Sequence, residues 1–187
     1  MSFFLSLKYI MLTPKKNTQL SNIIADLSSK ENKKIVFALE QLRKHGKKEA
    51  FLPLIDTLIA TTDDEIKQEI INLLYDLRDQ TIVETIISAI NNKKYTSIKP
   101  ILISIFWQSS LDGSQYISTF VRQAIKGDYF IGIEVLSVIE NFNSTFSEEE
   151  INDLKFDLDE AIETEETEKI NLLISIKTIL DSLNIEY

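Results

Sequence analysis

Hydrophobic residues recur along this chain with the spacing of an amphipathic α-helix, and the pattern repeats in pairs of segments. Residues 51–77 read FLPLIDTLIATTDDEIKQEIINLLYDL, which is an apolar segment, a short acidic turn and a second apolar segment. Similar units precede and follow it at intervals of about 28 to 38 residues, a period typical of proteins in which helix pairs stack into a solenoid.

Within each unit the apolar positions fall in one stripe of a helix. In the first segments they recur at i, i+1, i+4 and i+5. These positions hold Leu54, Ile55, Leu58 and Ile59, then Ile82, Val83, Ile86 and Ile87, then Tyr116, Ile117, Phe120 and Val121. The second segments align through Ile66, Ile70, Leu73, Leu74 and Leu77, and a last helix over residues 165–183 carries Ile170, Leu172, Leu173, Ile174, Ile176, Ile179 and Leu180. We therefore expect an all-α fold of about five antiparallel helix pairs, without strands.

Residues typical of helix starts lie between these segments. A hydroxyl followed three residues later by a carboxylate has the spacing of a capping box, and a lone Asp or Thr is a simple N-cap. The capping-box candidates are Thr62 with Glu65 and Ser147 with Glu150, and the simple candidates are Asp128 and Thr164.

Glycine and proline mark further boundaries. Gly46, Gly113 and Gly127 fall between predicted helices, where a left-handed C-cap is expected. Gly132 lies inside a predicted helix, where it would permit a close helix contact. Pro100 is expected in the first turn of its helix, where the missing amide costs little.

The 51–77 unit resembles a HEAT repeat. That family has a proline in the first helix, an Asp-rich turn, and an apolar residue followed by a basic one at the start of the second helix. The matching residues are Pro53, Asp63, Asp64 and the pair Ile66-Lys67, and Ile98-Lys99 repeats the last feature. The other units keep only the apolar pattern. The resemblance implies a right-handed α-α superhelix, with the second helices of each pair on the concave side, and it implies no particular ligand.

Composition agrees with a folded chain. The 187 residues are 44% hydrophobic and include four Gly, three Pro and no Cys. We see no internal linker and expect one domain over residues 1–187, with helical repeats over 17–183. The absence of cysteine excludes disulfides and thiol chemistry and fits a reducing compartment. The expected location is cytoplasmic, because the N-terminal segment lacks the features of a signal peptide.

The first 16 residues form a separate apolar segment. Residues 2–12 read SFFLSLKYIML, which is too short to span a bilayer and is interrupted by Lys8. We expect an N-terminal cap or extension and no integral membrane association. A membrane-surface anchor is one alternative, and translation from Met11 is another.

Charge is distributed unevenly along the chain. Residues 1–48 contain ten Lys or Arg and three Asp or Glu, whereas residues 144–187 contain three and thirteen. The acidic residues can form a polar end cap of the repeats or a docking site for a partner. The basic cluster from Lys30 to Lys48 is the basis of an alternative function, which is binding of nucleic acid or nucleoprotein.

Residues for catalysis are scarce. His45 is the one histidine and has no accompanying nucleophile motif, so it is expected to be a solvated turn residue. The acidic stretch Asp153, Asp157, Asp159, Glu160 and Glu163 lacks the spacing of a calcium loop. The sequence therefore predicts no enzyme, no cofactor, no metal and no small-molecule substrate.

These observations favour a non-catalytic protein-interaction module or scaffold. Tyr75 and Trp107 occupy equivalent positions of successive second helices, where an aromatic side chain would anchor a partner or pack between repeats. Lys67 and Lys99 open those helices. We take Tyr75, Trp107, Lys67 and Lys99 as candidate partner-binding residues, and the partner is an unidentified protein or peptide rather than nucleic acid.

Overall fold

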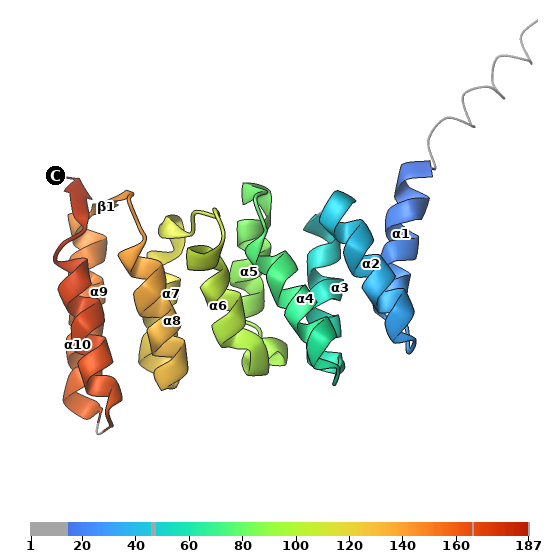
Figure 1. Cartoon of the computed structure of the whole chain (residues 1–187). Helices are drawn as coiled ribbons and strands as arrows, with labels where there is room; N and C mark the ends of the chain where they lie inside the picture. Colours follow the sequence, from blue (N-terminus) through green and yellow to red (C-terminus); the bar gives the residue numbers. More distant parts are fainter. Residues whose placement is uncertain (1–14, 46–47, 166, 187) are drawn as a thin grey trace, which may run out of the picture. The chain divides into compact units, whose positions relative to one another are not determined.

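The computed structural model describes residues 15–45, 48–165 and 167–186, which form ten α-helices and very little sheet (Figure 1). The α-helices are α1 (Lys15–Leu27), α2 (Asn32–His45), α3 (Phe51–Ala60), α4 (Asp64–Tyr75), α5 (Val83–Ile90), α6 (Lys99–Gln108), α7 (Ile117–Lys126), α8 (Tyr129–Glu140), α9 (Glu148–Thr164) and α10 (Lys169–Leu180). Short 3₁₀ helices η1 (Lys48–Ala50), η2 (Gln80–Ile82), η3 (Lys93–Ile98) and η4 (Ser114–Tyr116) precede α3, α5, α6 and α7, and the strands are β1 (Thr145–Ser147) and β2 (Asn184–Glu186).

Contacts divide the chain into two compact units, Met1–Leu73 and Leu74–Tyr187, which we call the N-terminal and C-terminal units. The division falls within α4. The expectation of one domain over residues 1–187 stays a prediction. The expectations for the N-terminal cap and for a start at Met11 concern residues outside the described ones.

In the N-terminal unit, α1 packs against α2 and α3 around a core that includes Ile23, Leu27 and Ile55. A buried hydrogen bond joins α3 to the end of α1, because Thr57 Oγ1 donates to the carbonyl of Leu27 at 3.1 Å. Thr57 rather than the expected Ile59 completes the buried face of α3, and Ile59 is 39% exposed. The expected burial of Ile59 was therefore wrong.

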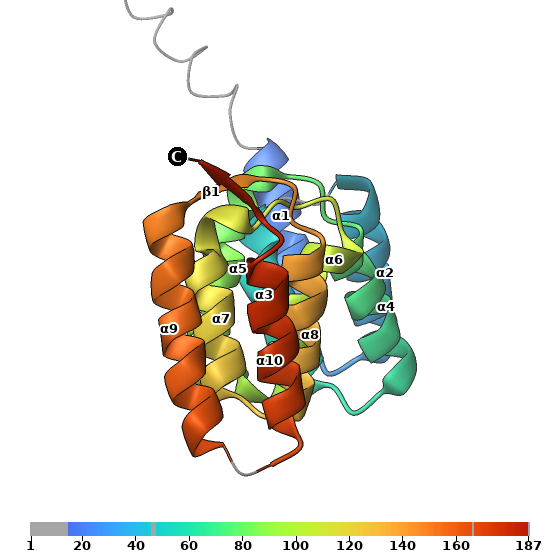
Figure 2. The ribbon, with the colours of Figure 1, turned by 90° about the vertical axis from the view of Figure 1, so that its left-hand side faces the viewer.

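In the C-terminal unit the helices form two layers, α5, α7 and α9 in one and α6, α8 and α10 in the other (Figure 2). Helix α8 packs against α6, α7 and α10. The predicted apolar stripes supply the core, and its fully buried members include Ile86, Ile105, Phe120, Val135 and Leu173. Ile174 was expected in the last stripe but is 46% exposed, because Leu172, Leu173 and Ile176 turn the opposite side of α10 inward.

Gly132 allows α8 and α10 to approach closely, as the sequence predicted. A Cβ atom at this position would lie 2.4 Å from Leu172 Cδ2. Pro100 also lies where it was expected, in the first turn of α6.

The other glycines act through steric room rather than backbone conformation. None of the glycines in the described ranges has a positive φ, so the expectation of left-handed C-caps at Gly113 and Gly127 was wrong. A Cβ at Gly113 would lie 2.6 Å from Phe106 Cδ1, and one at Gly127 would lie 2.6 Å from the carbonyl oxygen of Gln123. Gly46 lies outside the described residues.

Two of the four predicted helix caps are present. Ser147 Oγ accepts from the Glu150 amide at 3.2 Å, and Asp128 Oδ1 accepts from the Ile131 amide at 3.0 Å. In a complete capping box the Glu150 carboxylate would accept from the backbone amide of Ser147. Here the carboxylate accepts from Ser118 Oγ of α7 instead.

The other two predicted caps were wrong. Helix α4 begins at Asp64 and is capped by Asp63, whose Oδ1 accepts from the amides of Glu65 and Ile66. A carboxylate beside Thr62 takes the role that the hydroxyl was expected to play. Helix α9 continues through Thr164, whose hydroxyl donates to the Glu160 carbonyl one turn earlier.

The expectation of no strands was also wrong. Residues Thr145–Ser147 and Asn184–Glu186 pair in parallel, with Phe146 opposite Ile185. Segments of three residues are too short to give the two-residue alternation by which strands are recognised. The pairing joins the start of α9 to the residues that follow α10.

Candidate functional site

The four residues singled out from the sequence contact different neighbours. Tyr75 is half-buried at the end of α4, and its hydroxyl lies 2.9 Å from Ser104 Oγ of α6. Lys99 Nζ donates to Gln123 Oε1 of α7 at 2.8 Å. Both side chains are therefore engaged in contacts within the C-terminal unit.

Lys67 lies in the N-terminal unit and is committed to its own helix. Its Nζ is 2.8 Å from Asp64 Oδ1 in the first turn of α4. The hydrogen bond from Lys67 lowers the pKa of the Asp64 carboxyl below its ordinary value. The ion pair stabilises the start of α4, where a carboxylate complements the helix dipole.

Trp107 is a candidate whose large aromatic side chain is partly exposed and also contacts a neighbouring helix. It is in the last turn of α6, is 37% exposed, and its indole Nε1 donates to Glu134 Oε2 of α8 at 2.8 Å. The hydrogen bond fixes the orientation of the ring. One edge of the indole is held by the protein while part of the ring remains accessible.

Large apolar side chains project from the first half of α8 into solvent. Tyr129, Phe130 and Ile133 are 39%, 69% and 37% exposed, and the rings of Tyr129 and Phe130 pack edge to face at 6.3 Å. They are exposed because Ile131 and Val135 form the buried side of α8. The sequence pattern assigned no role to the pair Tyr129 and Phe130.

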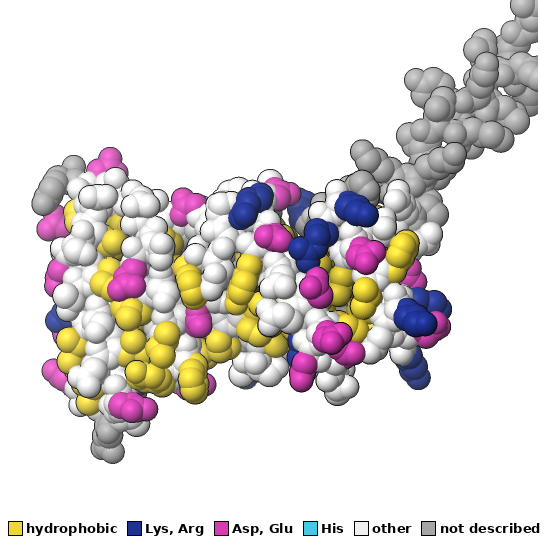
Figure 3. All heavy atoms as spheres, in the orientation of Figure 1, with side chains coloured by type: hydrophobic (Ala, Val, Ile, Leu, Met, Phe, Trp, Pro, Cys, Tyr) yellow, Lys and Arg dark blue, Asp and Glu magenta, His cyan; other side chains and the backbone are white. Residues whose placement is uncertain are grey.

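These side chains and Trp107 belong to one face of the C-terminal unit. Phe130 and Glu134 are four residues apart, so they lie on the same side of α8, and Glu134 contacts Trp107 of α6. Figure 3 shows hydrophobic side chains gathered over α6 and the lower half of α8. We call this region the α6–α8 surface and define it as Trp107, Tyr129, Phe130, Ile133 and Glu134.

A cleft extends the α6–α8 surface toward the last turns of the two helices. It has a volume of about 270 Å³ and is lined by Trp107, Phe106, Leu111, Val138 and Phe142 on its apolar side. Polar side chains complete the lining, namely Ser109, Ser110, Asp112, Asn141, Asn143 and Ser144. A bound chain would therefore find apolar contacts with hydrogen-bonding groups beside them.

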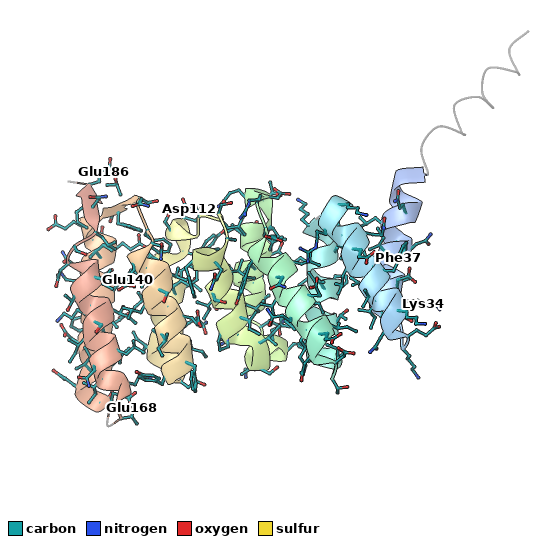
Figure 4. All side chains as sticks on the ribbon, viewed as in Figure 1. Lys34, Phe37, Asp112, Glu140, Glu168 and Glu186 are labelled. Atoms are coloured by element: carbon teal, nitrogen blue, oxygen red, sulfur yellow. The ribbon has the colours of Figure 1, made fainter. Side chains whose placement is uncertain are left out.

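Helix α8 carries two charged residues, Glu134 and Glu140, and both are negative. Glu140 is exposed and lies seven residues after Ile133, which places it on the same stripe of α8 (Figure 4). The lysines of the layer are turned elsewhere. Lys99 donates to Gln123 of α7, Lys169 is buried, and Lys177 pairs with Asp159 of α9.

The basic cluster of the N-terminal unit is partly neutralised. Lys34 Nζ is 2.6 Å from Glu31, whose hydrogen bond raises the pKa of the lysine, and Arg43 is 2.8 Å from Glu69. Lys47 and the side chain of His45 lie outside the described part. The cluster thus presents fewer uncommitted cations than the sequence suggested.

Two ion pairs join α9 to α10 and the residue that follows it, and one of them uses the acidic stretch of α9. Asp159 binds Lys177, and Lys155 of the same helix binds Asp181 at 2.6 Å. Across the described ranges, no group of three or more His, Asp or Glu side chains has the geometry to hold a metal ion. None of the helices in these ranges is both long and apolar enough to cross a membrane.

No protein-family model matches the chain, and the curated proteins and the solved structures contain no significant match to it.

Proposed function

We propose that this protein is a non-catalytic protein-interaction module and that its α6–α8 surface binds another protein. The observation that carries the proposal is the grouping of Trp107, Tyr129, Phe130 and Ile133 on adjacent helices, with Phe130 69% exposed. Grouped apolar side chains of this size on a folded unit are typical of protein–protein contacts. Aromatic residues are also the usual anchors of binding energy.

The setting of these residues favours tight recognition. They lie on helices rather than loops, and the indole of Trp107 is held by Glu134 before any partner arrives. Preorganised side chains lose little conformational entropy on binding. We therefore expect the α6–α8 surface to change little in shape when the partner docks.

We further propose that the repeated helix pairs form a HEAT-like solenoid. The layers α5–α7–α9 and α6–α8–α10 of the C-terminal unit support this, since α6 packs on α8, α8 on α10 and α7 on α9 of the adjacent pairs. In such a solenoid the α6–α8 surface belongs to the layer of second helices, which the HEAT resemblance places on the concave side. The alternative function, nucleic-acid binding near Lys30 to Lys48, has weaker support because Lys34 and Arg43 are in ion pairs.

Affinity capture with matched surface variants tests the protein-binding proposal. The baits are the tagged wild type, the double variant F130S/I133S, and F156S as the control, because Phe156 is 64% exposed on α9. Each is incubated with native lysate at low and moderate salt, with nuclease, and bound proteins are quantified by mass spectrometry. Circular dichroism confirms that the baits are folded.

We expect a stoichiometric protein partner that survives nuclease and moderate salt. Wild type and F156S should retain it equally, and F130S/I133S should lose about tenfold or more, as removal of central aromatic anchors does. Recovery of only nuclease-sensitive, salt-labile material would contradict the proposal and favour the basic cluster. Equal retention by F130S/I133S would show that the partner binds elsewhere.

A further inference from the structure

The α6–α8 surface combines apolar side chains with the carboxylate of Glu134, and the carboxylates of Glu140 and Glu168 belong to the same layer of helices. This combination restricts the kind of partner that fits the surface. From the charges and side chains of the surface we infer that the partner docks through a basic amphipathic segment. This segment would carry large apolar side chains on one side and Lys or Arg along its margins. The inference rests on the proposed function and specifies the chemistry of the partner.

The apolar half of the surface sets one requirement. Tyr129, Phe130 and Ile133 lie within five residues of one helix, and Trp107 lies across from them on α6. Two or three apolar side chains that recur every three or four residues along a bound helix would cover this area. A purely polar, charged segment would leave Phe130 in water.

The carboxylates set the other requirement. Glu134 and Glu140 follow the apolar residues along α8, and Glu168 lies just before α10, at the end of α10 nearest the start of α8 (Figure 4). Lys99, Lys169 and Lys177, the lysines of α6 and α10, are engaged with other parts of the unit. Hence an incoming Lys or Arg meets uncompensated carboxylates, whereas an incoming Asp or Glu is repelled.

The net charge of the whole C-terminal unit also favours a basic partner. Residues 74–187 contain nine Lys or Arg and twenty Asp or Glu. A potential of one sign over a binding face steers partners of the opposite sign and discourages partners of the same sign. It also disfavours a second copy of this unit as the occupant, because two such surfaces would bring Glu134 and Glu140 toward their own counterparts.

Three designed 18-residue peptides test the inference on the full-length protein. The first is an amphipathic helix of Leu and Lys, the second places Glu at every Lys position, and the third is a scrambled Leu/Lys isomer without an apolar face. Binding is measured by fluorescence anisotropy between about 50 and 300 mM salt, a range over which surface charges become screened. The proteins are wild type, F130S/I133S, E134Q/E140Q and F156S.

The amphipathic Leu/Lys peptide should bind wild type and F156S with equal affinity, within about twofold, and at least about tenfold more tightly than the scrambled isomer. F130S/I133S should weaken it by about tenfold or more, and E134Q/E140Q by about threefold with a flatter salt dependence. Gln at position 134 can still accept the hydrogen bond of Trp107, so the loss would report charge. The Leu/Glu peptide should not bind.

Several results would overturn the inference. Equal binding of the scrambled isomer would mean unspecific attraction to an acidic protein, and equal loss in F156S would place the peptide elsewhere. Self-association in sedimentation that F130S/I133S abolishes would identify a second copy as the occupant. Binding to neutral phosphatidylcholine vesicles that requires Phe130 would identify a lipid surface. A partner that affinity capture recovers through Phe130 but that lacks any basic amphipathic segment would leave the proposed function intact and refute only this inference.

Discussion

The turn between α7 and α8 has no room for a Cβ atom at Gly127. Its φ of −86° is open to any residue, so glycine is not needed for conformation. The need is for space, because an added Cβ would lie 2.6 Å from the Gln123 carbonyl oxygen and 2.8 Å from Ile131 Cβ. Neither of these atoms can move without moving the backbone.

We therefore predict that Gly127→Ala destabilises the protein by about 1–3 kcal/mol, the cost of overpacking a filled site. Lys126→Ala, at the exposed neighbouring position, should change the free energy of unfolding by only a few tenths of a kcal/mol. Urea unfolding followed by circular dichroism measures both. A Gly127→Ala variant as stable as wild type would show that the turn relaxes freely.

Lys169 and Glu165 stabilise the same turn between α7 and α8 through hydrogen bonds and an ion pair. Lys169 Nζ donates to the carbonyls of Ile125 and Gly127, both at 3.0 Å, and lies 3.0 Å from Glu165 Oε2. Thr167 donates to the other oxygen of this carboxylate at 2.6 Å. Hydrogen bonds from Thr167 and then Lys169 lower the pKa of Glu165 to about 2.

This shift makes part of the stability depend on pH. A carboxyl whose pKa is lowered on folding stabilises the protein above its ordinary pKa of 4.5, and this contribution is lost as pH falls from 4.5 toward about 2. Glu165→Gln should therefore be less stable than wild type at pH 7, with a difference that shrinks steadily below pH 4.5. Urea unfolding at several pH values measures it, with Glu163→Gln on the exposed side of α9 as the control.

A difference between Glu165→Gln and wild type that stays constant down to pH 3 would contradict this account. It would mean that the amide substitution disturbs packing rather than removing a charge. In that case a carbon-13 NMR titration should give the Glu165 carboxyl a pKa near its ordinary value of 4.5 instead of about 2.

Among the elements, the start of α4 shows which residue of an acidic turn does the capping. Asp63 Oδ1 accepts from two backbone amides, and its Oδ2 accepts from Asn32 Nδ2 at 2.7 Å. We predict that Asp63→Ala costs about 1–2 kcal/mol and that Asp63→Asn recovers part of it. Thr62→Ala should be neutral, within about 0.5 kcal/mol. Equal losses at positions 62 and 63 in urea unfolding would restore the capping box predicted from the sequence.

The helices and most of their buried faces could be predicted because both follow from the 3.6-residue period. Stripes such as Ile82, Val83, Ile86 and Ile87 are buried throughout. The pattern is ambiguous where two adjacent positions are both apolar, as at Leu173 and Ile174, since only packing against α8 and α9 decides which one turns inward.

The candidate site was predicted less completely than the helices. Trp107 stood out because aromatic residues recur at its position, but its partner Glu134 comes from a different helix pair. Phe130 has apolar neighbours along the chain, and only the placement of Ile131 and Val135 in the core turns it outward. Such surfaces depend on how helices pack, which a single sequence encodes only indirectly.

Considering the whole molecule, the two units differ in charge. Residues 1–73 contain eleven Lys or Arg and nine Asp or Glu, and residues 74–187 contain nine and twenty. The α6–α8 surface lies in the acidic unit, so apolar contact and long-range attraction act at the same place. We therefore propose that the partner binds to the C-terminal unit.

Site-specific photo-cross-linking shows where on the folded protein the partner binds. A benzophenone amino acid replaces either Phe130 or Phe156, both of which are mostly exposed, and irradiated native lysate is analysed by mass spectrometry. We expect a single major protein adduct from position 130 and none, or a much weaker one, from position 156. Adducts of equal strength from both positions, or an adduct from position 156 alone, would contradict it.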